Sequence, residues 1–462
     1  MTAARNTTLL VAAAAAVMLI TTGIRQVSGL FVLPILSTTG LSIASVSLAL
    51  AIGQFMWGAM QPVFGALADS YGAFRVVTFG ALLLAVGSVL TTFSHSEVAL
   101  IATMGVLSAA GAAAGSFSIL IGGTARRLQP HQRSTAAGTI NAGGSLGQFV
   151  MAPFAQAMIA AWGWGAAMCA LGATALATIP LALPLKREDA LASSEANIAA
   201  SPGAALHRDA CWRGGRQAFR RGRAKRSTGR DGRQAFECRC TKQPTGRGRK
   251  GHFQAPPRTS RSVSNSASRL ATPSYILLNI GFFTCGFHVA FLVTHFPGEI
   301  QNCGLLPSVA ANSLAIIGLF NVAGSIGAGM LGQRFRMKHL LALIYAVRAL
   351  LIAIYLVMPK TSLNIYLFAA GMGMTWLATV PPTSGIVGKL YGVRYLGTLF
   401  GLTLVSHQTG AFLGAWLGGV AMAHMHSYQW IWLADMALAL GAALINLPIR
   451  EDKPLPRTAV AA

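Results

Sequence analysis

The fold class is decided by the stretch Gly65-Ala66-Leu67-Ala68-Asp69-Ser70-Tyr71-Gly72-Ala73-Phe74-Arg75. The stretch follows an apolar run and supplies, in close succession, a helix-breaking glycine, one acid, a second glycine and one base. Within a bilayer, backbone groups can leave a helix only where water or protein satisfies them. The stretch therefore predicts a tight polar turn between two membrane-spanning helices at one face of the membrane.

The composition around this turn is that of a polytopic membrane protein. Of the 462 residues, 53% are hydrophobic and only 10% are charged, whereas a soluble domain carries roughly 25% charged residues. Runs long enough to cross about 30 Å of hydrocarbon recur along the chain. They lie near 8–36, 42–67, 75–94, 97–122, 135–160, 163–185, 274–297, 308–332, 339–358, 363–387, 396–422 and 428–448. The first is too long for the apolar region of a signal peptide, so we expect an uncleaved first span.

These runs predict an all-α integral membrane protein with two blocks of six helices. We expect a first bundle at 1–185, a linker at 186–272, a second bundle at 273–450 and a tail at 451–462. Basic residues fall in the termini and in the connections between even and odd spans. They are Arg5, Arg75, Arg126, Arg127, Arg133, Arg334, Arg336, Lys338, Lys389, Arg394, Arg450, Lys453 and Arg457, besides those of the linker. The positive-inside rule therefore predicts cytoplasmic termini in a plasma or inner membrane.

Most of the positive charge lies in the linker. Residues 186–270 hold 20 of the 36 Lys and Arg residues and 6 of the 12 Asp and Glu residues, which gives +14 of the net charge of +24. This Arg-, Gly- and Ser-rich stretch cannot bury a core, so we expect a disordered cytoplasmic linker. One alternative is that it binds RNA or anionic lipid headgroups, which attract polybasic segments. Another is an aberrant translated insert.

The two blocks repeat each other. In the first span Gly23 precedes Pro34 by eleven positions. In the seventh, Gly286 precedes Pro297 by the same interval. The opening turn recurs after the eighth span at 329–336, with a glutamine in place of the acid. Because both blocks begin on the same side, the repeats are parallel, related by an axis along the membrane normal. Glycine strings in the fifth and eleventh spans allow close helix packing, or sliding between the halves.

The arrangement resembles the major facilitator superfamily. The resemblance rests on the two six-helix blocks, the long cytoplasmic connection and the motif Gly65-x-x-x-Asp69-x-x-Gly72-x-x-Arg75. The fifth span, from Arg133 to Pro153, with Trp162-Gly163-Trp164 beyond it, is similar to the monocarboxylate-porter and oxalate/formate-antiporter branch. The resemblance implies a twelve-span transporter that works by alternating access.

The opening turn and its repeat are expected to act in gating. We predict that Asp69 and Arg75 form a conformational latch at the cytoplasmic face. The other residues assigned to this role are Gly65, Gly72, Arg334 and Arg336. The chain departs from the superfamily motif at Ser70, where a base is usual, and at Ala73, which is also often basic. Fewer charges are therefore present to hold that side closed.

Arg25 is the strongest candidate for substrate contact. It lies well inside the first span, and that span contains no acid to neutralise it. A guanidinium presents a planar fork that binds a carboxylate bidentately, which suits a small organic anion. In the fold that the chain resembles, the first, fourth, seventh and tenth spans line the central cavity. The resemblance thus implies that Arg25 faces its repeat-mate His288 at similar depth. The alternative is a structural arginine bonded to helix carbonyls.

Other polar residues of the spans are weaker candidates. His288 is either a second substrate contact whose charge changes near neutral pH, or a histidine simply held by hydrogen bonds. His407 and Gln408 in the eleventh span are assigned to the substrate site on the same terms. Polar side chains that either line the site or join helices are Asn141, Gln54 and Asn321.

Arg348 and Asp435 lie in the ninth and twelfth spans, which are peripheral in this fold, and are read as structural. They would pair if those helices were neighbours. The cavity-lining spans show no buried carboxylate, so coupling to a proton through His288 or His407, exchange with a counter-anion, and uniport all stay open.

No enzyme, cofactor or metal site is expected. The chain has no phosphate loop or nucleophile elbow, and Cys238-x-Cys240 lacks a second pair at zinc spacing. The function predicted is secondary transport of a small carboxylate or related organic anion through the bilayer, with no specific nucleic-acid partner. The alternatives are a drug or neutral-solute exporter of the same superfamily, and a membrane-tethered RNA- or lipid-binding protein acting through the linker.

Overall fold

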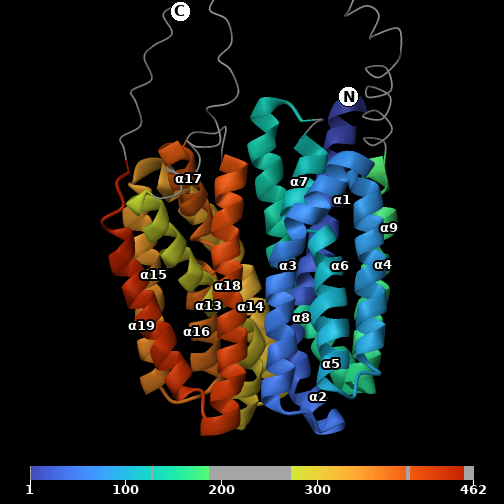
Figure 1. The fold of residues 1–462 in the computed structure, drawn as a ribbon, viewed down its shortest axis with the longest axis vertical. Coiled ribbons are helices and arrows are strands. Elements are labelled where there is room, and N and C mark those ends of the chain that lie inside the picture. Colours follow the sequence, from blue (N-terminus) through green and yellow to red (C-terminus); the bar gives the residue numbers. More distant parts are fainter. Residues whose placement is uncertain (1, 126–127, 187–271, 392–395, 452–462) are drawn as a thin grey trace, which may run out of the picture. The chain divides into compact units, whose positions relative to one another are not determined.

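The computed structural model describes residues 2–125, 128–186, 272–391 and 396–451 (Figure 1). The predicted linker and tail lie almost entirely outside these residues, as do Arg126, Arg127, Arg394, Lys453, Arg457, Cys238 and Cys240. Within the described ranges every regular element is helical. The described residues on both sides of the linker belong to one compact unit.

The first half begins with α1 (Thr2–Gln26), the short 3-10 helix η1 (Ser28–Phe31) and α2 (Val32–Thr39). The elements that follow are α3 (Ile43–Tyr71), α4 (Ala73–Thr91), α5 (Glu97–Leu100), the π-helix η2 (Ile101–Ser108), α6 (Ala109–Ala114), α7 (Phe117–Ala125), α8 (Pro130–Leu176) and α9 (Thr178–Leu181). The second half contains α13 (Pro273–Asn302), α14 (Pro307–Arg334), α15 (Met337–Val357), α16 (Ser362–Thr375), α17 (Val380–Tyr391), α18 (Leu396–Met425) and α19 (Gln429–Asn446).

Ten segments of the described chain are long and apolar enough to cross a membrane. One of them contains both the fifth and the sixth predicted spans, because α8 continues across Gly163, whose φ of 81° breaks the helical geometry. The predicted eleventh span is α18, in which His407 and Gln408 lower the hydropathy. The predicted all-α fold of twelve spans in two six-helix halves is therefore confirmed.

The internal repeat is visible as the same helix pair in each half. α1 packs along α8 in the first half, and α13 packs along α18 in the second. Glycine permits both contacts. A Cβ added at Gly147 would lie 2.1 Å from the Leu19 carbonyl oxygen, and one added at its repeat-mate Gly410 would lie 2.0 Å from the Phe283 carbonyl oxygen.

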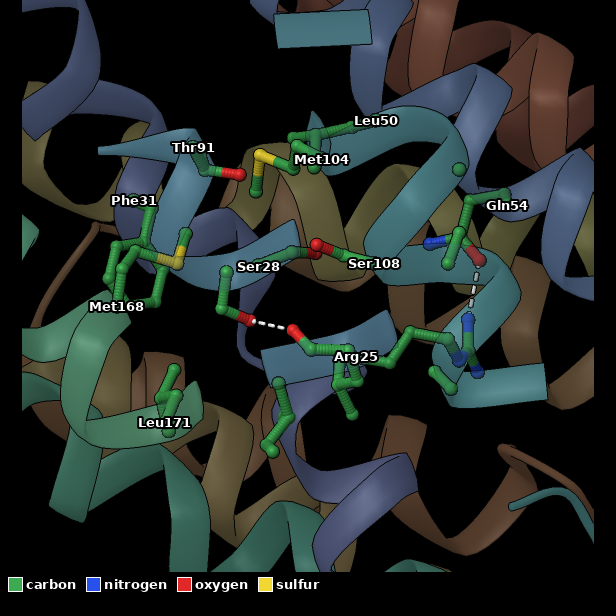
Figure 2. Close-up of a pocket in the computed structure, with 16 residues that line it drawn as sticks. Arg25, Ser28, Phe31, Leu50, Gln54, Thr91, Met104, Ser108, Met168 and Leu171 are labelled. Atoms are coloured by element: carbon green, nitrogen blue, oxygen red, sulfur yellow. Dashed lines mark hydrogen bonds between the residues drawn. The ribbon is translucent and has the colours of Figure 1, made fainter. Parts of the chain in front are cut away.

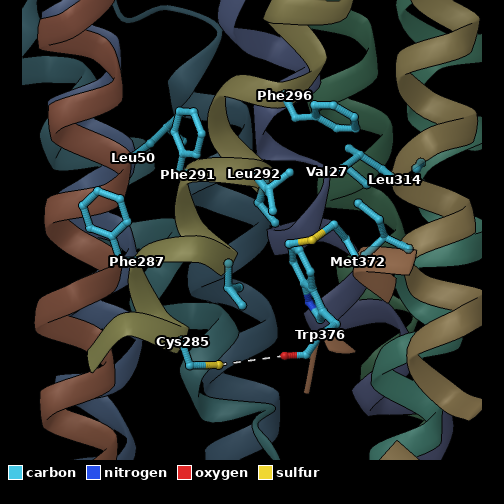
Figure 3. Close-up of a cluster of buried hydrophobic side chains, with 14 of the residues drawn as sticks. Val27, Leu50, Cys285, Phe287, Phe291, Leu292, Phe296, Leu314, Met372 and Trp376 are labelled. Atoms are coloured by element: carbon cyan, nitrogen blue, oxygen red, sulfur yellow. Dashed lines mark hydrogen bonds between the residues drawn. The ribbon is translucent and has the colours of Figure 1, made fainter. Parts of the chain in front are cut away.

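The two halves meet along two seams, which Figure 1 shows at the centre of the view. In one seam α3 packs on α18, and in the other α8 packs on α14. Asn321 of α14 donates a hydrogen bond to Ser145 Oγ of α8 at 2.9 Å. Of the two roles predicted for Asn321, it therefore joins helices. The buried apolar cluster also crosses between the halves, since it contains Val27 and Leu50 of the first half together with Phe291 and Leu292 of α13 (Figure 3).

The opening turn differs from its prediction in one respect. Gly65 does not break the helix, because α3 continues through it to Tyr71. A single glycine costs a helix only about 1 kcal/mol, too little to end it among good helix formers. The chain turns at Gly72 instead, with φ of 92° and ψ of 148°. In the repeat, α14 ends at Arg334 and the turn passes through Phe335 in an extended conformation.

Gly72→Ala is expected to destabilise the protein, because residues with a side chain rarely adopt this φ and ψ. Holding alanine in such a conformation costs about 1–3 kcal/mol. Thermal unfolding of the purified protein measures the effect. The matched control is Gly65→Ala, where an added Cβ meets nothing within 4 Å. That variant should unfold at the same or a higher temperature, since alanine favours helix by about 0.5–1 kcal/mol. Equal unfolding temperatures for the two variants would contradict the prediction.

Candidate functional site

A pocket opens inside the first half, between α1, α3, α4, α8 and the helices of the fourth span (Figure 2). The centre of a water molecule can occupy about 60 Å³ of it. Its walls are mostly apolar, with Leu50, Met104, Met168 and Leu171 among them. Its polar groups are Arg25, Ser28, Gln54, Ser88, Thr91 and Ser108. An apolar cavity with few polar groups is the usual form of a small-molecule site.

Arg25 carries the positive charge of this pocket. It lies in the last turn of α1 and is half-buried. Its Nη1 donates a hydrogen bond to Gln54 Oε1 at 2.5 Å (Figure 2), and its Cζ lies 4.2 Å from the centre of the Trp57 ring. The structural alternative of bonds to helix carbonyls is not the one observed, since the partner is a side-chain amide.

The charge of Arg25 has no counter-ion in the described part of the chain, where no carboxylate lies within ion-pair distance of it. Its Nε is buried without a hydrogen-bond partner. A desolvated cation with an unused donor is costly unless an anion neutralises it. The pocket is therefore chemically suited to a ligand with a negatively charged group.

The prediction that Arg25 faces His288 is wrong. Arg25 reaches from α1 to α3 inside the first half, whereas His288 lies in the second half against Asp435 of α19. Equal spacing in the repeats gives the two residues similar depth. Depth does not determine which side of its helix each side chain occupies, and here both point into their own bundle.

His288 and Asp435 form a fully buried pair. His288 Nδ1 and Asp435 Oδ1 are 2.5 Å apart, and the side chains are 1% and 0% exposed. Neither of these atoms has a hydrogen-bond partner among the described residues, so the contact has the geometry of an ion pair rather than of a hydrogen bond. Sequence reasoning placed a titratable group at His288 and missed its carboxylate partner.

Arg348 does not pair with Asp435, although α15 and α19 are neighbours as that prediction required. Its Nη2 donates instead to the carbonyl oxygens of Thr375 and Trp376, the latter at 2.6 Å. These carbonyls lie where α16 ends, and a buried cation satisfies the acceptors left free there. Arg348 thus has the structural role that was predicted, with a different partner.

A second carboxylate, which is half-buried, was missed because of Pro297. The seventh span was predicted to end at this proline, but α13 continues through it to Asn302 and contains Glu299. Glu299 accepts hydrogen bonds from Tyr355 Oη at 2.8 Å and from Trp432 Nε1 at 2.6 Å. The seventh span therefore extends further than predicted and includes a half-buried acid near its end.

The remaining predicted substrate residues lie outside the Arg25 pocket. The His407 ring lies 4.9 Å from that of Phe282, within the second half. Gln408 covers Gly58 of α3 in the seam between the halves. Asn141 is half-buried on α8. Their roles as substrate contacts stay predictions. Gln54 lines the pocket, in agreement with one of its two predicted roles.

The predicted gating residues lie at the ends of helices. Asp69 and Arg75 are exposed on either side of the turn at Gly72, and Arg334 and Arg336 are exposed at the equivalent turn between α14 and α15. Exposure at a turn is compatible with a gating role. Their gating role stays a prediction.

Glu451, at the end of the second half, connects α17 with the start of α15. It forms an ion pair with Lys389 of α17 and accepts a hydrogen bond from the Lys338 backbone N–H at 3.1 Å. Burial raises the pKa of the Glu451 carboxyl, but these hydrogen bonds lower it more, so that the pKa lies below its usual value. The junction is therefore intact at neutral pH and weakens as the pH falls through that lowered pKa.

Comparisons with known proteins agree with this architecture. The profile of the Major Facilitator Superfamily matches residues 10–415. Monocarboxylate transporter 13 of Rattus norvegicus is 23% identical over 430 residues, which cover 92% of this chain and 85% of that protein. Monocarboxylate transporter 11 of Mus musculus is 33% identical over 134 residues, only 29% of each chain.

A solved structure shares the fold. It is a bacterial homolog of the human lysosomal transporter Spinster, in an inward-facing and occupied conformation. The TM-score is 0.62 at 14% sequence identity, and the match covers 94% of this chain and 92% of the other. At this identity the similarity concerns the fold alone.

Proposed function

The chain belongs to the Major Facilitator Superfamily, and from this membership we propose a secondary transporter that moves a small carboxylate or a related organic anion by alternating access. The proposed location is a plasma or inner membrane, with both termini cytoplasmic, because the basic residues gather at that side of the spans.

The observation that carries this proposal is Arg25. Its guanidinium faces a mostly apolar pocket, has no carboxylate partner among the described residues and leaves Nε unused. A carboxylate fits this fork bidentately, and the apolar walls suit a short hydrocarbon tail. The names of the relatives support the same substrate class, since they are monocarboxylate transporters.

The main alternative is a drug or neutral-solute exporter of the same superfamily, which the apolar lining of the pocket also favours. This alternative does not account for the positive charge of Arg25 in the pocket. A membrane-tethered RNA- or lipid-binding role would depend on the linker, and the described residues add nothing to it.

Counterflow into vesicles containing the purified protein tests the proposal. The panel is labelled acetate, lactate, butyrate and oxalate, with glycerol as a neutral probe. We expect saturable exchange of at least one carboxylate and none of glycerol. Saturable export of cationic drugs without exchange of any carboxylate would favour the alternative.

We further propose that the His288–Asp435 pair gives uptake its dependence on pH, because the two side chains are buried and 2.5 Å apart, so a proton on the imidazole is held directly against the carboxylate. His288→Gln and Asp435→Asn are each expected to flatten the pH profile of uptake. The control is His339→Gln, at an exposed histidine, and His407→Gln tests the other candidate. A profile that survives His288→Gln would remove His288 from the mechanism.

A further inference from the structure

Gln54 stands at the border between the Arg25 pocket and the seam of the two halves. At 3.6 residues per turn, Trp57 lies roughly 60° to one side of Gln54 around α3, and Gly58 lies roughly 40° to the other. Arg25 contacts the Trp57 side. Gln408 of α18 occupies the Gly58 side, where an added Cβ would lie 2.2 Å from its Cγ. One glutamine is thus adjacent to both the site and the seam.

The amide of Gln408 lacks a hydrogen bond at this seam. The side chain is only 4% exposed, and its Oε1 is buried without a partner. Gln54 is 5% exposed, and its Oε1 accepts the bond from Arg25. In the described chain its Nε2 donates to no acceptor. A buried acceptor without a donor costs free energy that a nearby amide N–H would recover.

Gln408 Cγ lies close to where a Cβ at Gly58 would be, one helical turn along α3 from Gln54. Residues four apart on a helix face have Cβ atoms about 5–6 Å apart, so the Gln54 side chain starts one turn from the place that Gln408 covers. While Arg25 holds Gln54 Oε1, the Gln54 amide is kept on the pocket side. Release of that bond frees the amide to turn toward α18.

We propose that Gln54 is a two-position hydrogen-bond switch that reports occupancy of the Arg25 site to the seam. A carboxylate bound to Arg25 replaces Gln54 Oε1 on the guanidinium, and Gln54 Nε2 then donates to Gln408 Oε1. Gln54 and Gln408 are positioning residues in this scheme. The inference rests on the proposed function insofar as the anion is the substrate, but the switch itself can be tested without any ligand.

The switch links binding to the packing of the halves. Anion binding adds a hydrogen bond between α3 and α18, so it stabilises the packing of this seam. Linkage requires the reverse as well, so a state in which the seam opens binds the anion more weakly. This is the behaviour that alternating access needs at the step where substrate is released.

The switch can be tested without ligand by making Gln408→Leu both in the unaltered protein and in the Arg25→Met variant, and comparing the unfolding temperatures. Arg25→Met removes the donor that holds Gln54, so the bond between Gln54 and Gln408 should form. In this background Gln408→Leu breaks that bond and is expected to lower the unfolding temperature by on the order of 3 °C. With Arg25 present, the same substitution removes only an unpaired acceptor, so the unfolding temperature should stay the same or rise. Equal shifts in the two backgrounds would overturn the proposal.

Gln148→Leu is the matched control. Gln148 is a fully buried glutamine of α8 with no hydrogen-bond partner, close to Gly318 in the other seam. Its substitution should shift the unfolding temperature equally with and without Arg25. A background-dependent shift at Gln148 would mean that Arg25 acts on the seams in general, which also contradicts the switch. Arg25→Leu replaces Arg25→Met if the latter is not recovered.

Labelled butyrate provides the readout of binding and transport. Because anion binding is proposed to add the Gln54–Gln408 bond, Gln408→Leu is expected to weaken butyrate binding about two- to tenfold, measured by quenching of the protein's tryptophan fluorescence, and to lower exchange at low butyrate concentration by the same factor. Unchanged binding and exchange in this variant would overturn the coupling. If the unaltered protein binds no carboxylate, the proposed function fails, and the thermal comparison still decides on the switch.

Discussion

Arg25→Gln is expected to reduce carboxylate uptake strongly while the protein stays folded. The variant removes the charge that is proposed to hold the anion and keeps a polar side chain of similar reach. Hydrogen bonds to charged groups contribute about 1.5–3 kcal/mol, which corresponds to a rise of about 10- to 150-fold in the half-saturating concentration. Initial rates of labelled carboxylate uptake into vesicles measure this effect.

Thermal unfolding separates the loss of substrate binding from a loss of structure. Arg25 is a desolvated cation without a carboxylate partner among the described residues, so its neutralisation removes an unfavourable term. The unfolding temperature of Arg25→Gln should therefore equal or exceed that of the unaltered protein. A variant that unfolds early would mean that Arg25 is structural.

Two further variants sharpen the experiment. Arg25→Lys keeps the charge and loses the planar fork, so uptake should be intermediate between those of Arg25→Gln and the unaltered protein. Arg450→Gln removes an exposed arginine at the end of the second half and should leave uptake unchanged. Full uptake by Arg25→Gln would refute the role of Arg25 as anchor.

Gly286→Ala is expected to lower the free energy of unfolding more than any other glycine-to-alanine substitution considered for this protein. An added Cβ would lie 1.8 Å from the His407 carbonyl oxygen and 2.7 Å from its carbonyl carbon. Because the obstacle is backbone, no rotamer change relieves the clash, and α13 and α18 must move apart. Overpacking costs about 1–3 kcal/mol, and a clash with backbone should lie at or above the upper end.

The matched variants are chosen by what an added methyl group meets. At Gly23, the repeat-mate in the first half, an added Cβ would lie 2.6 Å from Met151 Cγ and 2.8 Å from the Gly147 carbonyl oxygen, so the overlap with backbone is smaller than at Gly286 and Gly23→Ala should cost less. At Gly441 of α19 nothing lies within 4 Å, so Gly441→Ala should be neutral or stabilising. Unfolding temperature and yield in detergent test this order. Equal unfolding temperatures for Gly286→Ala and Gly441→Ala would refute the role of the backbone clash.

The sequence predicted the membrane body well because its signals are local. Twelve apolar runs, their short connections and the basic residues at one side are properties of consecutive residues, and the hydrocarbon thickness translates them directly into spans. Errors occurred where packing overrides a local signal. Gly65 and Pro297 were taken as helix ends, but α3 and α13 continue through them. Neighbouring helices compensate for one unfavourable residue, and Glu299 was missed for that reason.

By itself, the sequence determined that this protein spans the membrane twelve times in two parallel repeats, and it predicted Arg25 and His288 at similar depth. Only the tertiary structure decided their partners, Gln54 and Trp57 for Arg25 and Asp435 for His288. The reason is geometric. Distance along the chain sets the height of a residue on its helix, while the direction of its side chain depends on how each helix is rotated in the bundle. That rotation results from the sum of all glycine contacts and seams between helices, which no local pattern of residues contains.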